Sequence, residues 1–118
     1  MIGGVGMDIV DVERLRVALR RTTRFAEMVF TDQERASSGD GPSRTRRLAA
    51  MFAAKEAFLK AVGIGLWQGV PLREIEVVGS SLRLGPNAEK ALRDCRCARA
   101  ELTLSHARGT AVAMVLVH

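Results

Sequence analysis

Aromatic residues are scarce in this chain of 118 residues, which holds 4 Phe, 1 Trp and no Tyr. Proteins that bind single-stranded nucleic acid stack the bases on aromatic side chains, so this scarcity argues against such a role. The net charge of +5 and the sequence pI near 10.2 nevertheless keep a basic nucleic-acid-binding module as an alternative.

Cysteines are few, and long apolar runs are missing. Cys95 and Cys97 are separated by one residue, which is too close for an easy disulfide, and no zinc-binding pattern surrounds them. No apolar run approaches the roughly 18 residues of a membrane helix, and the N-terminus lacks the order of a secretory signal. We therefore expect a cytoplasmic protein, and a chain of 118 residues suits a single domain over residues 1–118. With 47% apolar and 26% charged residues, which are ordinary globular proportions, this domain should have a packed core.

The glycine patterns of the common nucleotide-binding loops are absent. Residues 4–8 begin like a dinucleotide fingerprint, but no third glycine follows at the required spacing. Gly63 and Gly65 follow a predicted helix, whereas phosphate-binding loops place their glycines before one. These observations exclude a Rossmann domain.

Hydrophobic periodicity and turn residues predict an α+β domain with helices packed on an antiparallel sheet. The predicted elements are a strand ending near Ile9, a helix over about 12–21, a capping box at Thr31–Glu34 with a short helix to Ser37, a long helix over about 43–62 closed by Gly63, strands over 75–78 and 82–84, a helix capped by Asn87 and ending near Asp94, and strands around 102–106 and over 110–117.

The long helix carries an apolar stripe, formed by Leu48, Phe52, Leu59 and Val62, that should face the core. Lys55 falls in the middle of this stripe, so its ammonium has to reach water past its neighbours or find a buried partner. Of these two outcomes, the first is the commoner. Glu56 lies at the margin of the stripe.

Two carboxylates could together hold a hard cation such as Mg²⁺: Asp8, at the end of an apolar strand, and Glu56. The alternative is structural, with Asp8 capping the next helix and Glu56 paired with Lys60 one turn further along. Residue types alone favour this alternative. His106 shares a strand face with leucines, a position that is more often structural than catalytic.

Arginines gather in two groups, which indicates two surfaces that attract an anionic partner. The first group comprises Arg14, Arg16, Arg20, Arg21 and Arg24, and the second comprises Arg44, Arg46 and Arg47.

The segments GVGMDIV (residues 4–10) and FAAKEAFLKAVG (residues 52–63) resemble the two signature motifs of the holo-acyl-carrier-protein synthase family of 4'-phosphopantetheinyl transferases. The resemblance extends over essentially the whole chain. It implies a transferase that moves the phosphopantetheine arm of coenzyme A onto a serine of an acyl carrier protein in fatty acid biosynthesis, releasing adenosine 3',5'-bisphosphate. It also implies a homotrimer whose active sites are shared between neighbouring subunits, with Asp8 and Glu56 across the cleft.

The resemblance further assigns roles to individual residues. Asp8 and Glu56 are expected to bind Mg²⁺, and Lys60 is expected to supply an ammonium to the phosphates. Glu56 is expected to accept the proton of the serine, directly or through a metal-bound water. The nucleotide contacts implied are Lys60, Gly63, Gly65, His106, Arg44 and Arg47. The residues implied in docking an acidic carrier protein are Arg14, Arg21, Arg24 and Phe25.

Two departures from the family pattern leave alternatives open. Met51 stands where the family usually has a basic residue, and Gly79-Ser80-Ser81 shortens the hairpin between the middle strands. A paralogue dedicated to a polyketide or other specialised carrier is therefore an alternative, and a catalytically silent scaffold that only binds the carrier is another.

Overall fold

The computed structural model describes residues 1–118. Its elements are β1 (Gly4–Asp11), α1 (Val12–Arg21), α2 (Thr23–Val29), α3 (Asp32–Ser37), α4 (Arg44–Val62), the 3-10 turn η1 (Leu72–Glu74), β2 (Ile75–Val78), β3 (Ser81–Leu84), α5 (Pro86–Asp94), β4 (Ala100–Ala107) and β5 (Thr110–Val117). The α+β class and the predicted elements are confirmed, and α2 is an additional helix. No helix is both long enough and apolar enough to cross a membrane.

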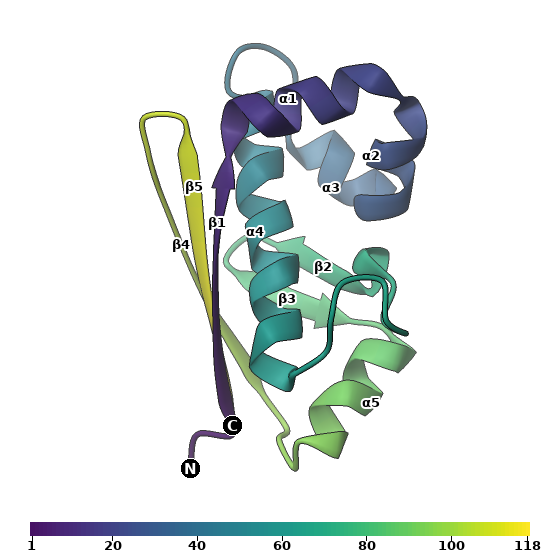
Figure 1. Cartoon of the computed structure of the whole chain (residues 1–118), viewed down its shortest axis with the longest axis vertical. Coiled ribbons are helices and arrows are strands. Elements are labelled where there is room, and N and C mark those ends of the chain that lie inside the picture. The colour runs from purple at the N-terminus through teal and green to yellow at the C-terminus, as the bar shows by residue number, and fades with distance from the viewer.

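A three-stranded antiparallel sheet in the order β1-β5-β4 forms one side of the molecule (Figure 1). Successive side chains of a strand point to opposite faces, so burial alternates along β1 and β5. The inner face of β5 is fully buried and consists of Ala111, Ala113, Val115 and Val117. The outer face of β1 leaves Val5, Met7 and Ile9 exposed.

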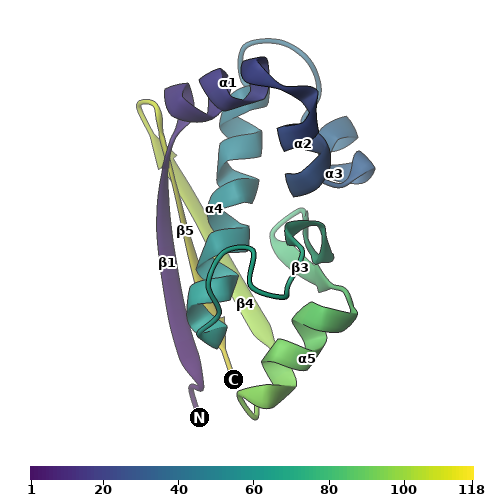
Figure 2. The same cartoon turned by 45° about the vertical axis from the view of Figure 1, so that its right-hand side comes forward.

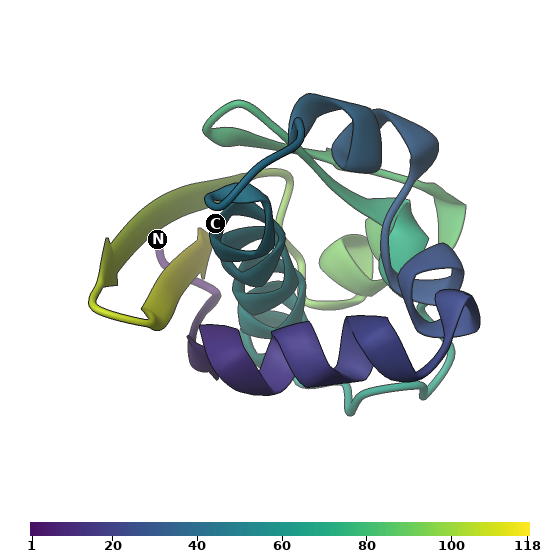
Figure 3. The ribbon, with the colours of Figure 1, turned by 90° about the horizontal axis from the view of Figure 1, so that it is seen from above.

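The central element is α4, seen nearly end-on in Figure 3, and the sheet packs against one side of it. The contact is close because Gly4 and Gly6 have no side chain: an added Cβ would overlap the backbone oxygens of Ala61 and Ala57. The predicted apolar stripe was too narrow, since α4 buries an alanine face against the sheet as well as its large side chains on the other side.

On that other side lie a two-stranded antiparallel sheet, β2 and β3, and the helix α5, as the turned view in Figure 2 shows. The prediction that Asn87 caps α5 was wrong, because the N-cap is Gly85 and Pro86 opens the helix. The carboxylate of Glu74 performs the capping from outside, accepting the backbone N–H of Asn87 at 2.7 Å and of Ala88 at 3.3 Å.

Lys55 does not extend to water, so the expectation that its ammonium would reach the solvent was wrong. It is fully buried, and its Nζ donates to Glu34 Oε1 at 2.8 Å, to the carbonyl of Leu72 at 2.9 Å and to the carbonyl of Ile75 at 2.8 Å. Burial lowers the pKa of Lys55, and the charge of Glu34 opposes this shift. All three ammonium protons therefore have acceptors inside the core.

Candidate active site

Asp8 and Glu56 meet where β1 crosses α4. Asp8 belongs to the inner face of β1, together with Gly4 and Gly6, so the close approach of strand and helix carries its carboxylate toward α4. Both carboxylates line the same cavity of about 360 Å³. Asp8 and Glu56 are far apart in the sequence, so only the fold of the single chain brings them to the same cavity.

The environment disfavours the charged form of Glu56. Partial burial raises the pKa of Glu56, and the charge of Asp8 raises it further, while the charge of Lys60 acts in the opposite direction. Two carboxylates in contact repel each other when both are ionised, so one tends to keep its proton. The pair is therefore arranged to hold a proton or a cation.

Lys60 supplies the positive charge beside this pair. Its Nζ donates to Asp8 Oδ1 at 2.8 Å and to the carbonyl of Met7 at 3.0 Å. The hydrogen bond to Asp8 raises the pKa of Lys60. The lysine side chain is 55% exposed and that of Asp8 only 12%, so the ammonium lies at the surface while the carboxylate lies beneath it.

The structural alternative for the two carboxylates is wrong on both counts. Asp11, not Asp8, caps α1, its Oδ1 accepting the backbone N–H groups of Glu13 at 2.9 Å and Arg14 at 3.1 Å. Lys60 forms its ion pair with Asp8 rather than with Glu56. Asp8 and Glu56 are thus left to share one cavity.

A second cavity of about 510 Å³ adjoins the first, and the two share Arg14, Ala18 and Phe25 as lining residues. Arg21 lines the outer cavity only. The ring of Phe25 packs edge-on against Phe52 of α4, with 5.9 Å between the ring centres. Three of the four predicted docking residues therefore form one groove with the carboxylates, whereas Arg24 lies beside it on the first turn of α2 and is exposed.

The predicted glycine positions lie at the end of α4. Gly63 ends the helix in the left-handed conformation, with φ of 76°. Gly65 begins a tight turn, in which its carbonyl accepts the backbone N–H of Gln68 at 3.2 Å and its own N–H donates to Gln68 Oε1 at 3.1 Å. These positions come three and five residues after Lys60, so they lie near the charged cluster along the chain.

His106 does not join the cluster. It is exposed at the end of β4, opposite Ala111, whereas Asp8 pairs with Ala113 from the other side of β5. Two strand spacings separate β4 from β1, which is about 10 Å. Within one chain, this imidazole is too far away to contact the carboxylates.

Arg44 and Arg47 are occupied elsewhere. Arg44 Nη1 donates to the carbonyls of Arg35 at 2.7 Å and Gly39 at 2.8 Å, and Arg47 Nη1 donates to the carbonyl of Ser38 at 3.0 Å. At about 1.5 Å of rise per residue, Arg44 lies about 18 Å along α4 from Glu56. Both guanidinium groups close the loop that leads into α4.

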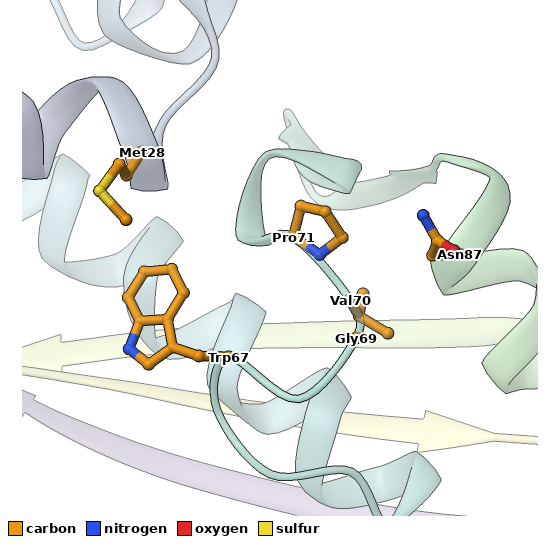
Figure 4. Close-up of a pocket in the computed structure, with 6 residues that line it drawn as sticks. All are labelled: Met28, Trp67, Gly69, Val70, Pro71 and Asn87. Atoms are coloured by element: carbon orange, nitrogen blue, oxygen red, sulfur yellow. The ribbon is translucent and has the colours of Figure 1, made fainter.

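Sequence reasoning missed two features. The first is Glu34, which completes the predicted capping box with Thr31 and is also the buried partner of Lys55. A carboxylate in a capping box gives no sign of a third, long-range contact. The second is an apolar cavity of about 370 Å³ around Met28 and Trp67, drawn in Figure 4, which shares no lining residue with the carboxylate cavity.

The donor set of the cluster fits Mg²⁺. No three His, Cys, Asp or Glu side chains gather as a metal-binding group anywhere in the chain, so the protein offers the pair Asp8 and Glu56 alone. Mg²⁺ is usually held in this way, by one or two carboxylates with waters and substrate phosphates completing the shell.

The family model of the 4'-phosphopantetheinyl transferase superfamily matches residues 4–113. The chain is 39% identical over 119 residues to the holo-[acyl-carrier-protein] synthase of Geobacillus kaustophilus (strain HTA426), covering 99% of this chain and 89% of that protein. It is 40% identical over 123 residues to the enzyme of the same name from Geobacter metallireducens, covering 99% and 98%. The chain belongs to the holo-[acyl-carrier-protein] synthase family. It is therefore a phosphopantetheinyl transferase, as the two signature motifs predicted.

Solved structures of the family share the fold over the whole chain. The holo-[acyl-carrier-protein] synthase of Neisseria meningitidis superposes with a TM-score of 0.88 at 31% identity, covering 100% of this chain and 99% of that one. A Bacillus anthracis holo-(acyl-carrier-protein) synthase in complex with CoA (3',5'-ADP) superposes with a TM-score of 0.80 at 31% identity, covering 99% and 96%.

Proposed function

We propose that this protein transfers the 4'-phosphopantetheine group of coenzyme A to a serine of an apo acyl carrier protein and releases adenosine 3',5'-bisphosphate. The observation that carries the proposal is the cluster of Asp8, Glu56 and Lys60: the two carboxylates line a cavity that shares residues with an arginine-lined groove, and Lys60 pairs with Asp8. A phosphate-bearing substrate and a protein substrate have to meet in this reaction. The cluster and the groove provide adjoining places for them.

Glu56 is the residue suited to accept the serine proton. The serine oxygen forms a bond to the β-phosphorus, the bond from that phosphorus to the bridging oxygen breaks, and the hydroxyl proton passes to the Glu56 carboxylate. A base works best when its pKa lies near the working pH. Burial and the charge of Asp8 raise the pKa of Glu56 in this direction.

Asp8 and Glu56 would hold Mg²⁺, which when bound neutralises charge that develops on the phosphate oxygens. Lys60 provides a fixed positive charge for the same purpose. Its ammonium is anchored by Asp8 and by the carbonyl of Met7, while more than half of the side chain stays exposed to a substrate. A donor held in place before the reaction stabilises developing charge without having to reorganise.

The groove beside the cluster is suited to a carrier protein with an acidic surface. Arg14 lines both cavities and Arg21 lines the outer one, so positive charge extends from the carboxylates along α1. Opposite charges steer partners into contact and increase the association rate. Because the arginine-lined groove leads to the carboxylate pair, a carrier protein is favoured over a nucleic acid as the anionic partner.

We further propose a homotrimer. The outer face of the large sheet exposes Val5 by 52%, Met7 by 49% and Ile9 by 64%, and Met114 of β5 adds 39%. A continuous apolar face of this kind is characteristic of an interface between chains. Another subunit at this face would also bring further residues to the nucleotide, and His106 could take part there from a neighbouring chain. Light scattering coupled to size-exclusion chromatography measures the number of chains directly.

The experiment that tests the function is intact-mass spectrometry of an apo carrier protein incubated with this protein, coenzyme A and Mg²⁺. We expect the mass of one phosphopantetheine group to be added, and a parallel sample with a chelator to show none. Glu56→Gln should abolish the addition while circular dichroism shows an unchanged fold. Full activity of Glu56→Gln would remove Glu56 from the mechanism.

The same assay with a panel of apo carrier proteins tests which biosynthetic pathway the protein serves. We propose the carrier of fatty acid biosynthesis as the substrate and the cytoplasm as the location. Modification of a polyketide carrier alone would instead support a dedicated paralogue. No modification of any carrier, together with retained binding, would support a silent scaffold.

A further inference from the structure

The apolar cavity of Figure 4 lies between the end of α2 and the loop that follows α4. It is lined by Met28, Trp67, Gly69, Val70, Pro71 and Asn87. Trp67 is 50% exposed and Met28 is 43% exposed, and Figure 4 shows the sulfur-bearing chain of Met28 directed toward the indole ring. Exposure of two large apolar side chains to water is unfavourable, and a partner that covers them lowers the free energy of the complex.

The backbone holds Trp67 in this exposed position. Its φ is 62°, in the left-handed region that a bulky side chain rarely adopts. The turn from Gly65 to Gln68 encloses it with two hydrogen bonds, and Gly69 follows with φ of 101°. A strained conformation fixed by its surroundings is typical of a functional position.

The floor of the cavity is preformed. Val70 is 4% exposed, and Asn87 is fixed by Glu74, which accepts from its backbone N–H at 2.7 Å and from its Nδ2 at 2.8 Å. A cavity whose floor and walls are already ordered costs little conformational entropy when it binds.

The cavity and the groove described above both border α2, through Met28 and Phe25 respectively. Met28 lies three residues after Phe25 on α2, which places both on neighbouring positions of one helix face. Phe25 lines the groove that also contains Arg14 and Arg21. An apolar cavity containing Trp and Met, with an arginine-lined groove at the same helix, has the composition of a protein–protein hot spot.

We propose that the Trp67 cavity receives an apolar side chain of the acidic carrier protein while the arginine groove holds the carrier's charged surface. The inference rests on the proposed function and extends the docking surface beyond α1 to the loop after α4. A protein partner is favoured over coenzyme A because the two large exposed side chains are apolar and no Lys, Arg or His lines the cavity to meet a phosphate.

Trp67 is the only tryptophan and the chain has no tyrosine, so its fluorescence reports on this cavity directly. Apo carrier protein without coenzyme A should shift the emission to shorter wavelength, because the indole leaves water. A shift caused by coenzyme A alone, with none caused by the carrier, would assign the cavity to the cosubstrate and overturn the proposal. An unchanged spectrum with saturating carrier would also overturn it.

Kinetics provides the second test. Trp67→Ala and Met28→Asp should each raise the KM for the carrier about tenfold or more, as truncation of a hot spot does, and leave the KM for coenzyme A unchanged. Leu66→Ala is the matched control, since Leu66 is 39% exposed on the same loop but does not line the cavity. Circular dichroism and thermal unfolding establish that each variant is folded.

The failure of this inference can be distinguished from failure of the proposed function. The docking proposal is wrong, and the proposed activity is unaffected, if the wild-type protein modifies the carrier and both variants have the same KM for the carrier as the wild type. If the wild-type protein modifies no carrier, the proposed function itself is wrong.

Discussion

Replacing Lys55 by methionine should cost most of the stability margin of the fold. Methionine is an unbranched side chain that reaches as far as the lysine Cε, so the variant loses the ammonium while keeping a similar apolar stem. It leaves the carboxylate of Glu34 buried without its counterion and removes a donor from the carbonyls of Leu72 and Ile75. Glu34 retains its hydrogen bonds from the N–H groups of Thr31 and Val77.

The magnitude follows from the burial of both partners, each of which has a side chain 0% exposed. Removal of one member of a buried ion pair costs about 3–5 kcal/mol, because the other charge remains desolvated. The two carbonyls add to this cost, and the apolar methionine offsets part of it, so we expect a loss of about 4 kcal/mol. Domains have a total stability of about 5–15 kcal/mol, so this loss brings the variant near its unfolding threshold.

The assay is urea unfolding followed by circular dichroism at 25 °C, with equal protomer concentrations because assembly adds to apparent stability. Lys90→Met is the control: Lys90 forms an exposed ion pair with Asp94 at 2.9 Å, and its loss should cost under about 0.5 kcal/mol. In the double variant Lys55→Met/Glu34→Gln the uncompensated charge is gone, so about 1–3 kcal/mol should return. A cost below about 1 kcal/mol for Lys55→Met would refute the reasoning.

Three further changes test other parts of the structure. Burial tends to raise the pKa of Glu74, but hydrogen bonds from Asn87 and Ala88 outweigh it, so the pKa of Glu74 is lowered in the folded protein. The capping of α5 by Glu74 therefore stabilises the fold fully above the unfolded pKa near 4.5. This stabilisation is lost as the pH falls through the lower pKa of the folded state. Glu74→Gln should remove this pH dependence and cost about 1 kcal/mol at neutral pH, measured by urea unfolding across pH; an unchanged profile would contradict the capping role. Gly6→Ala should cost about 1–3 kcal/mol, because the new methyl group overlaps the backbone of Ala57 and Ala61. Gly41→Ala is the comparison for backbone strain without overlap, because Gly41 has φ of 91° and nothing lies near its Cβ position. Arg14→Glu should raise the KM for the carrier about tenfold without changing that for coenzyme A, whereas Arg93→Glu on α5 should change neither; an equal effect of the two would show that net charge alone matters.

Local signals in the sequence predicted most of the elements correctly. The capping box at Thr31 and Glu34 and the helix-ending Gly63 are short-range features whose partners lie within a few residues, so they can be read without a fold. The wrong cap at Asn87 has the opposite cause. Its helix is capped by Glu74 from η1, a residue that no local pattern connects to α5.

The site could be predicted only as a set of residues. The motifs singled out Asp8, Glu56 and Lys60, but their contact depends on how β1 packs on α4, which is a long-range property. The partner of Lys55 was unpredictable for the same reason, since Glu34 comes from α3. Trp67 gave no signal because its exposure results from an unusual backbone conformation rather than from periodicity.

The tight packing of β1 on α4 explains how two carboxylates that repel each other stay together. The pKa of Glu56 is raised by burial and by Asp8, so the contact between these groups costs stability instead of adding to it. Asp8 is held against α4 by its ion pair with Lys60 and by the fit of Gly4 and Gly6, on the same strand face, to the backbone of α4. Gly6→Ala should therefore lower Mg²⁺-dependent turnover as well as stability. The loss of turnover should be seen in the absence of urea, where the variant is fully folded. If its turnover equals that of the wild type while its unfolding midpoint falls, the carboxylates do not depend on this packing for their position.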